Sequence, residues 1–414
     1  MVSLPIPTDP IVIRSFIMHD AFLKKPVFEG YKDLCKIIPD FDYPEYEFWY
    51  YRFVAGNPDM NYDRSADPKP LKLQELRVDA LRKILEKVDV KHRFKIQKLS
   101  KIMLLVVNQL ETAHNTIDID CYKNYVTVYV KVGNSSWGLQ YSSMLNGCEA
   151  HRNRRSEKIV GSDFMEIALH DLGFILRPTK IRLENFEICS HDSKDMNRIV
   201  DLLVSISKKA TSEFHVKSAK IEIREPNLAL SVLSAMKPGV MEKLKIGIFY
   251  EYEREYTKTL IDMNRIKDME QFTRAKTVDL TEFGFIQSTD LAFFSGFEHF
   301  DVRVKSMESE DLIRLRDDLS KPDNNIFQSC SIKPDVPFMD VFELTRGLGK
   351  HVRHKWVHIV ESSIANSEKI LQFFVQRDNI DIHKTEPTPD GYHSTSDDSG
   401  SDLERDWNSS EDDW

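Results

Sequence analysis

Three histidines in the C-terminal third of the chain are spaced so that they could bind one metal ion. The segment HVRHKWVH places His351, His354 and His358 at i, i+3 and i+7, and on a helix these imidazoles would share one face. The stretch HKWVHIV alternates apolar and polar residues, however, and this alternation favours a strand. We therefore expect partly exposed strand histidines here, with no metal and no cofactor.

A short basic run is the second candidate for chemistry. The segment RNRR at 152–155 could contact phosphate groups, but four residues in a polar loop are more typical of a solvated surface. The sequence contains neither a Gly-rich phosphate loop nor a G-x-S-x-G nucleophile motif. We therefore predict no catalytic residue and do not expect an enzyme.

Four serines near the C-terminus are candidates for phosphorylation. Ser399, Ser401, Ser409 and Ser410 each have an acidic residue three positions on, which suits acidic-directed kinases, and phosphate would add negative charge to an acidic tail. Residues 385–414 contain ten Asp and Glu and one Arg. With almost no apolar residues to bury, this tail is predicted to be disordered.

The totals limit the classes of protein that remain. The chain has 414 residues, enough for two or three domains, and its net charge of −9 comes from the tail. Its five cysteines are scattered without a metal-ligand or redox spacing, which favours reduced thiols in the cytoplasm or the nucleus. No signal peptide and no membrane span is expected.

An aromatic-rich stretch lies near the N-terminus. The segment EFWYYRFVAGNPDMNYDRS at 47–65 could stack on nucleic-acid bases or form the core of a small helical domain. Residues 9–65 contain ten acidic and seven basic side chains, and a net negative surface repels DNA. We therefore predict that Trp49 and Phe53 are core residues, that Gly56 ends their helix, and that DNA is an unlikely partner. A Pro-rich linker at 57–72 is expected to follow.

The next segment, residues 68–110, is predicted to be helical. Leu81, Ile84, Leu85 and Val88 recur on one face of a first helix, and a second such face follows from Ile96 to Val107. The many lysines between these positions are expected to lie on the solvated faces of the helices. A full apolar stripe on so short a segment predicts packing against another surface.

Strand patterns dominate the remainder of the chain. Residues 115–150 contain the alternating segments YVTVYVKV and SWGLQYS, which predict a β-hairpin region. Residues 175–384 alternate strand-like with helix-like pieces at intervals of roughly twenty to forty residues. This rhythm predicts an irregular α/β array, similar to leucine-rich repeats, that ends in closing strands. The fold class is therefore α+β and multidomain.

The helical segment after the linker resembles an F-box. It carries an amphipathic helix that ends at Val88-Asp89, where F-boxes usually have Leu-Asp, followed by Arg93-Phe94 in place of the usual Arg-Leu. Arg77 stands where the family usually has proline. The resemblance implies that this segment docks on a Skp-family adaptor through the apolar residues Leu76, Val78, Leu81, Ile84, Leu85, Val88 and Phe94.

The flanking segments add to this resemblance. The spacing of Trp49, Tyr50, Arg52, Phe53 and Gly56 resembles the helix-turn-helix domain of mariner-type transposases. The segments AKTVDLTEF, FEHFDVRVKSMESEDLIRLRDDL and NSEKILQFFV resemble an FTH domain. The order of the three modules is similar to that of F-box proteins that join a helix-turn-helix domain, an F-box and a C-terminal FTH domain.

This resemblance implies a function without bond chemistry. The chain is expected to be the substrate-recognition subunit of a Skp–cullin–F-box ubiquitin ligase, binding the adaptor, through it a cullin, and an unidentified protein target. A transposase-derived DNA-binding or chromatin-associated protein is the alternative. An adaptor-binding protein that acts outside any ligase also remains open.

Overall fold

The computed structural model describes residues 9–67, 73–110, 112–152, 155–176, 180–191, 193–208, 213–248, 259–321, 324–352 and 357–387. The chain divides into two compact units, Met1–Glu75 and Leu76–Trp414, which we call the N-terminal unit and the C-terminal unit. The predicted acidic tail lies outside the described residues from residue 388 onward, and so do its four candidate phosphorylation sites.

Three helices form the N-terminal unit: α1 (Pro10–Phe22), α2 (Val27–Ile37) and α3 (Tyr43–Val54), followed by the 3-10 turns Arg64–Ala66 and Leu73–Glu75. The side chain of Asp9 caps α1 by accepting a hydrogen bond from the Ile11 amide at 2.9 Å. Gly56, with φ of 83°, ends α3. The amides of Gly56 and Asn57 donate to the carbonyls of Phe53 and Arg52, which is a Schellman motif.

The aromatic stretch forms the core of this unit, as predicted. Trp49 is fully buried and Phe53 is 9% exposed, and the indole of Trp49 donates to Glu45 at 2.6 Å. Met60 and Tyr62 pack against the same core. Part of the segment that was expected to be a linker therefore belongs to the folded unit, because its apolar side chains cover α1 and α3.

The C-terminal unit begins with three helices where two were expected: α4 (Val78–Glu86), α5 (Val90–Ile96) and α6 (Lys101–Gln109). Asp89 caps α5, and the side chain of Ser100 caps α6 by accepting from the Met103 amide at 3.2 Å. The Ser100 cap starts a new helix and so divides the expected second helix into α5 and α6. We call residues 76–110 the F-box-like segment.

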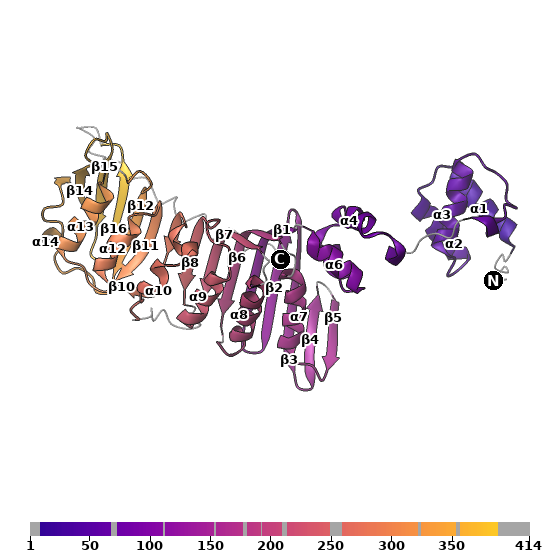
Figure 1. Ribbon diagram of the computed structural model, residues 1–414, viewed down its shortest axis with the longest axis horizontal. Coiled ribbons are helices and arrows are strands. Elements are labelled where there is room, and N and C mark those ends of the chain that lie inside the picture. The colour runs from indigo at the N-terminus through magenta and orange to yellow at the C-terminus, as the bar shows by residue number, and fades with distance from the viewer. Residues whose placement is uncertain are drawn as a thin grey trace. The chain divides into compact units, whose positions relative to one another are not determined.

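A single 16-stranded sheet runs through the remainder of this unit (Figure 1). Its strands, in chain order, are β1 (Thr112–Cys121), β2 (Tyr125–Val132), β3 (Ser135–Met144), β4 (Gly147–Arg152), β5 (Arg155–Val160), β6 (Lys180–Ser190), β7 (Glu213–Glu222), β8 (Lys243–Gly247), β9 (Thr277–Asp279), β10 (Phe285–Ile286), β11 (His299–Val304), β12 (Ser329–Pro334), β13 (Lys350–Val352), β14 (His358–Ser363), β15 (Ile370–Val375) and β16 (Ile380–Thr385).

The sheet has a parallel centre and antiparallel ends. Its order is β13-β14-β15-β16-β12-β11-β9-β8-β7-β6-β1-β2-β3-β4-β5, with β10 paired beside β11. In the central part of this order, from β12 to β1, neighbouring strands are parallel. At one end β1–β5 form antiparallel hairpins, and at the other β12, β16, β15, β14 and β13 are joined in antiparallel pairs. Strand β1 joins the hairpin region to the α/β region. The two predicted segments, 115–150 and 175–384, therefore share one sheet.

Helices cover one face of this sheet. The longer ones are α7 (Phe164–Leu176), α8 (Ser193–Ser207), α9 (Pro226–Ser234) and α13 (Ser309–Leu319), and the short ones are α10 (Asn264–Lys267), α11 (Glu270–Thr273), α12 (Leu291–Phe294) and α14 (Val341–Leu344). Because successive parallel strands are added in one direction, their right-handed crossovers fall on the same side. One continuous apolar core lies beneath the helices, and the opposite face carries the alternate, polar side chains. We call that face the open face.

These observations confirm an α+β fold with a helical N-terminal part and a large mixed sheet. The strand-like and helix-like pieces predicted from the sequence, including the closing strands β14 to β16, lie where they were expected. Within the residues that the structure describes, none of the helices is both long and apolar enough to span a bilayer.

The packing of Gly30 generates a stability prediction. A Cβ atom at this position in α2 would lie 2.0 Å from the hydroxyl oxygen of Tyr46 and 2.8 Å from a carboxylate oxygen of Asp20, two groups that form a 2.9 Å hydrogen bond. Gly30→Ala should therefore destabilise the N-terminal unit by about 1–3 kcal/mol through overpacking. Hydrogen exchange measured on peptides from α1–α3 would show the loss of protection.

Gly138→Ala in the C-terminal unit is the control for this measurement. A Cβ atom at Gly138 would meet nothing within 4 Å, so protection in both units should stay unchanged. Equal protection of α1–α3 in the Gly30→Ala variant and the wild type would contradict the packing described here.

Candidate functional site

The F-box-like segment has its own small core. Leu81 and Leu85 are 0% and 2% exposed and pack with four residues of α6 and its end, namely Met103, Val106, Val107 and Leu110. The resemblance placed Leu81 and Leu85 among the adaptor contacts. In the structure both side chains are already covered by the same chain, and their role as adaptor contacts stays a prediction.

The other five candidates divide into buried and exposed groups. Leu76 and Val88 are half-buried against the small core, and Phe94 is half-buried against the core of the large sheet. Val78 and Ile84 are 50% and 42% exposed. Of the seven candidate residues, Val78 and Ile84 are therefore the most accessible to a partner.

Sequence reasoning missed an exposed apolar row next to these residues. Leu99, Ile102 and Leu105 are 74%, 43% and 61% exposed, and they follow one another at intervals of three residues, so that Ile102 and Leu105 lie on one side of α6. The apolar face predicted from Ile96 to Val107 would include Leu99 on its buried side. The capping residue Ser100 was the available signal, since a new helix start after Leu99 removes Leu99 from that face.

Asp89 and Arg93, from the two residue pairs that resemble F-box motifs, have clear structural roles. The carboxylate of Asp89 accepts from the His92 amide at 2.9 Å at the start of α5, and the hydrogen bonds from the His92 side chain and amide lower the pKa of Asp89. The guanidinium of Arg93 donates to the carbonyls of Val88 and Glu86, both at 2.8 Å. These contacts cap the end of α4 and fix the turn between the two helices.

The buried carboxylate of Asp171 connects the F-box-like segment to the sheet. Asp171 lies on α7 and is 2% exposed. It accepts from Lys98 at 2.6 Å, from the Tyr141 hydroxyl at 2.7 Å and from Arg152 at 3.2 Å. Burial raises the pKa of Asp171, but the hydrogen bonds from Lys98 and Tyr141 and the nearby positive charges outweigh burial, and the net pKa is lowered. The carboxylate is therefore held ionised.

Two further residues complete this attachment. The side-chain amide of Gln97, 3% exposed, donates to the Phe174 carbonyl at 3.2 Å. The ammonium of Lys98 lies 4.2 Å from the ring centre of Phe94. Because these contacts are buried or half-buried and specific in geometry, the F-box-like segment is fixed on α7 within one compact unit.

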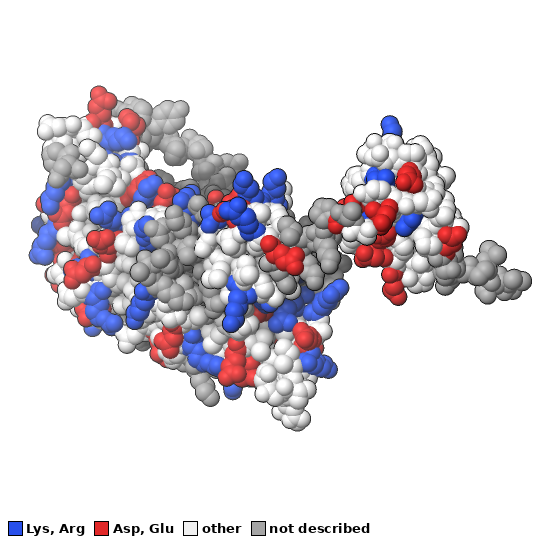
Figure 2. Space-filling model, turned by 45° about the vertical axis from the view of Figure 1, so that its right-hand side comes forward, with Lys and Arg blue, Asp and Glu red and all other residues white. Residues whose placement is uncertain are grey.

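The open face of the sheet carries rows of half-buried polar side chains. One row crosses eight strands and comprises Asp118, Glu187, Lys220, Lys245, Asp279, Asp301, Ser331 and Asp381. Figure 2 shows acidic and basic side chains interspersed over the described surface of the C-terminal unit in its view. Mixed charge of this kind favours selective pairing with a complementary protein surface over general attraction to one sign of charge.

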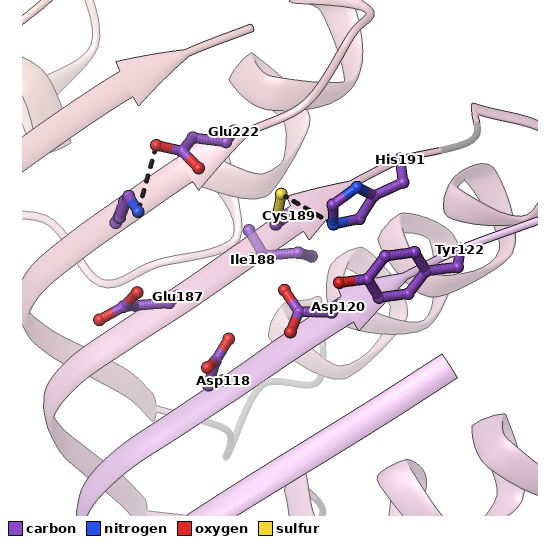
Figure 3. A pocket seen from close by; sticks show the side chains of 9 residues that line it. Asp118, Asp120, Tyr122, Glu187, Ile188, Cys189, His191 and Glu222 are labelled. Carbon is purple, nitrogen blue, oxygen red and sulfur yellow. Dashed lines mark hydrogen bonds and ion pairs between the residues drawn. The ribbon is translucent and has the colours of Figure 1, made fainter. Parts of the chain in front are cut away.

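A charged cavity of about 240 Å³ lies on the open face where β1, β6 and β7 meet (Figure 3). Its lining comprises Asp118, Asp120, Tyr122, Glu187, Ile188, Cys189, His191, Lys220 and Glu222. Burial, together with the carboxylates of Asp120 and Glu187, raises the pKa of Asp118 to about 7. Burial also raises the pKa of Asp120 and of the Cys189 thiol. The sequence analysis did not identify this cavity, although Cys189-Ser190-His191 at a strand end was a local signal.

The histidine and arginine candidates have mixed outcomes. His351 and His358 are exposed and lie on β13 and β14, so the strand prediction is confirmed for them, and His354 lies outside the described residues. Arg152 is not a simply solvated loop residue, because it pairs with Asp171 and with Glu157 at 2.9 Å. Residues 153 and 154 lie outside the described residues.

The basic residues of the N-terminal unit are engaged within that unit. Arg14, Arg52 and Arg64 lie over the rings of Trp49, Tyr62 and Phe48, at 4.1, 3.7 and 3.8 Å. Lys25 and Lys36 both pair with Asp33, and Lys32 lies over Phe28. Six of the seven basic side chains in residues 9–65 therefore have partners in their own unit, which does not favour the DNA-binding alternative.

The dihedral angles of Arg77 generate a second prediction. Arg77 is the N-cap residue of α4, with φ of −62° and ψ of 146°, and proline fixes φ near this value. Arg77→Pro should therefore keep or raise the stability of the C-terminal unit, by up to about 1 kcal/mol. Lys83→Pro, in the interior of the same helix, should cost about 3 kcal/mol. Urea denaturation compares the two variants, and a clear loss of stability in Arg77→Pro would contradict this account.

The Asp171 network generates a third prediction. Asp171→Ala leaves the cation of Lys98 and the hydroxyl of Tyr141 without their carboxylate, and breaking a buried ion pair costs about 3–5 kcal/mol. Hydrogen exchange of residues 78–110 should rise in this variant as well. Asp317→Ala is the control, because the side chain of Asp317 is 62% exposed, and it should change stability by less than about 0.5 kcal/mol. Equal effects of both substitutions would show that the network does not anchor the segment.

Comparisons with known proteins support two of the three modules directly. Residues 10–57 match the HTH domain in Mos1 transposase, and residues 197–377 match the FTH domain. The chain is also 28% identical over 261 residues to F-box A protein 224 of Caenorhabditis elegans, covering 59% of this chain and 65% of that protein. The match thus spans slightly less than two thirds of the relative.

The match to a protein with this name is consistent with an F-box in the chain, although neither matched family covers the F-box-like segment. The resemblance expected from the sequence is thereby confirmed: the chain joins a Mos1-type helix-turn-helix segment to an FTH domain and is similar to an F-box protein.

Proposed function

We propose that the protein is the substrate-recognition subunit of a Skp–cullin–F-box ubiquitin ligase. One observation carries the proposal: an F-box-like three-helix segment is fixed, through Asp171, to the unit whose residues 197–377 match the FTH domain. The similarity to F-box A protein 224 supports it. In this role the chain performs no bond chemistry and holds a target near a ubiquitin-charged enzyme, which raises the local concentration of the target.

The proposed adaptor surface is formed by the exposed apolar residues of the F-box-like segment. These are Val78 and Ile84 on α4, and Leu99, Ile102 and Leu105 at and along α6. Single exposed apolar residues are common on proteins, but a row of three on a short segment is a typical feature of an interaction site. The small core beneath them, formed around Leu81 and Leu85, keeps these side chains in place.

The proposed target surface is the open face of the sheet. Its parallel strands follow one another like the units of a repeat protein, and such arrays present extended surfaces to their partners. The row from Asp118 to Asp381 supplies charges of both signs at fixed intervals across neighbouring strands. The target is therefore a folded or extended protein segment with complementary charges.

Attachment of the F-box-like segment to α7 has a mechanical consequence for this function. A flexible joint would let the target move freely relative to the adaptor, whereas the buried contacts of Lys98 and Gln97 hold both surfaces in one body. A fixed orientation increases the fraction of time that the target spends within reach of the transferring enzyme.

Substitutions on the proposed adaptor surface test the function. Leu99→Asp with Leu105→Asp should weaken binding of the full chain to a purified Skp-family adaptor at least about thirtyfold, because residues central to an interface each contribute about 2 kcal/mol or more. The double variant Val78→Asp with Ile84→Asp tests in the same way whether the exposed residues of α4 contribute to adaptor affinity. Isothermal titration calorimetry gives the dissociation constants.

Two controls separate binding from folding. Val160 lies on β5 and is 83% exposed, so Val160→Asp should leave both the affinity and the melting temperature unchanged. Leu81→Asp should lower the melting temperature, because it places a carboxylate in the small core. The proposal fails if the wild-type chain does not bind the adaptor at tens of micromolar, or if both exposed double variants bind as the wild type does.

A further inference from the structure

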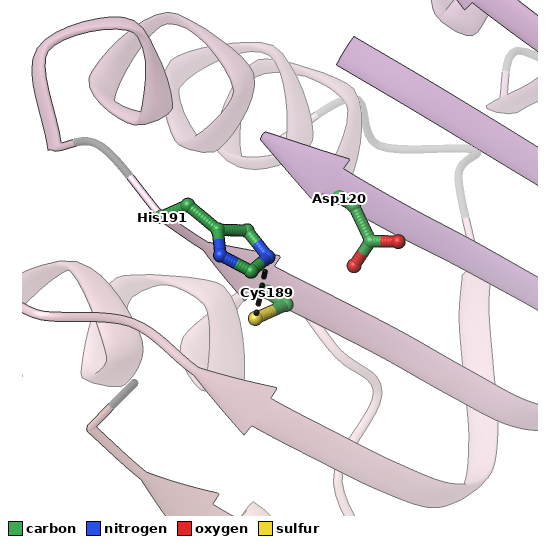
Figure 4. A group of neighbouring side chains, drawn as sticks. All are labelled: Asp120, Cys189 and His191. Atoms are coloured by element: carbon green, nitrogen blue, oxygen red, sulfur yellow. Dashed lines mark hydrogen bonds between the residues drawn. The ribbon is translucent and has the colours of Figure 1, made fainter. Parts of the chain in front are cut away.

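Three side chains of different types converge at one end of the charged cavity. Asp120 is on β1, Cys189 is its cross-strand partner on β6, and His191 follows directly after β6. Each residue offers one ligand atom: a carboxylate oxygen, the thiol sulfur and an imidazole nitrogen. These three atoms lie within 4.8 Å of one another. Figure 4 shows the three side chains pointing toward one another. We propose that they form a binding site for a zinc ion.

The distance between the sulfur and the nitrogen matches tetrahedral zinc coordination. Zinc binds sulfur at about 2.3 Å and histidine nitrogen at about 2.0–2.1 Å, so two such ligands are about 3.5 Å apart when the angle between them is tetrahedral. The sulfur of Cys189 and Nε2 of His191 are 3.7 Å apart. Both groups can therefore bind one ion after shifts of a few tenths of an ångström. Three protein ligands leave the fourth position to water.

The imidazole is held in place before any ion arrives. The ring of His191 stacks on Tyr122 with the centroids 3.8 Å apart and an interplanar angle of 12°, and Tyr122 stacks in turn on Tyr125 at 4.2 Å. The His191 amide donates to the Cys121 carbonyl at 2.8 Å, which fixes the backbone against β1. Such positioning lowers the entropy that would be lost on binding.

The charge of the cavity favours a divalent cation. Four carboxylates line it, from Asp118, Asp120, Glu187 and Glu222, against one ammonium from Lys220, which pairs with Glu222 at 3.2 Å (Figure 3). An ion between Asp120 and Cys189 would offset the repulsion among the acidic groups. A thiolate with an imidazole selects zinc over magnesium or calcium, which prefer oxygen ligands alone. Binding would release the thiol proton of Cys189 to solvent.

Zinc binding at this site would be a property of the chain that its proposed function as a ligase subunit does not require. It would connect β1, β6 and the residue that follows β6, and its open coordination position would lie in the cavity on the open face. The same contact distance is also compatible with a thiol hydrogen bond to the imidazole and no metal. The experiment has to separate these two possibilities.

Cobalt provides the direct measurement, because a tetrahedral Co²⁺ site with a thiolate ligand has a charge-transfer band and intense d–d bands. The full chain, stripped of metal with a chelator and exchanged into clean buffer, is titrated with Co²⁺ and then with Zn²⁺. We expect bands at one equivalent of Co²⁺, their displacement by Zn²⁺, and a higher melting temperature with Zn²⁺ than without it.

Cys189→Ser and His191→Gln should abolish the thiolate band and weaken zinc binding by more than the ~10–100-fold that loss of an outer-shell partner costs. Cys35→Ser is the matched control, since Cys35 is the other half-exposed free cysteine, and it should bind as the wild type does. Melting temperatures of all variants in the presence of chelator show whether each one is folded.

Two results would overturn the proposal. The first is a folded wild-type chain that gives no cobalt bands and no zinc-dependent rise in melting temperature, which would leave the thiol–imidazole hydrogen bond as the explanation. The second is a band that persists in folded Cys189→Ser and disappears in Cys35→Ser, which would place metal binding in the N-terminal unit.

Discussion

A single buried carboxylate holds together parts of the C-terminal unit that are distant in sequence. Asp171 on α7 accepts hydrogen bonds from the end of α5, from β3 and from β4, so the F-box-like segment, the hairpins and the helical layer meet at one charge. An ionised group in this position is tolerated only because three donors surround it. The apolar contacts of Val90 and Phe94 and the hydrogen bond from Gln97 add to this attachment. The arrangement makes the F-box-like segment part of the sheet's own core.

The second constraint is the order of the parallel strands. Because β6, β7, β8, β9, β11 and β12 follow one another in space as they do in the chain, every crossover returns on the same side, and the helices and the apolar core collect there. The alternate side chains of each strand are then left on the open face as straight rows. The cavity beside Asp120 and the row that begins at Asp118 are products of that geometry and not of any single motif.

Local patterns predicted most of the elements, and tertiary partners decided the rest. The aromatic core around Trp49 and the helix stop at Gly56 follow from spacing and turn chemistry alone. The burial of Leu81 and Leu85 could not be separated from that of Ile84, because all three share one helical stripe and only the position of α6 distinguishes them. The meeting of Asp120 with Cys189 depends on strand pairing between residues about seventy positions apart, which one sequence does not reveal. Asp171 gave no signal, since an acidic residue in a helix is usually solvated.

The two ends of the sheet differ in how they resist further growth. An exposed edge strand offers unpaired backbone groups to any other extended chain, and proteins limit this with charge or with short strands. At one end β5 presents Arg155, Glu157 and Lys158 in an almost fully exposed strand, and at the other β13 has three residues within the part of the chain that the structure describes. Both edges are therefore poor templates for polymerisation. With both edges protected in this way, a sheet of sixteen strands offers its broad face, and not its edge strands, to a binding partner.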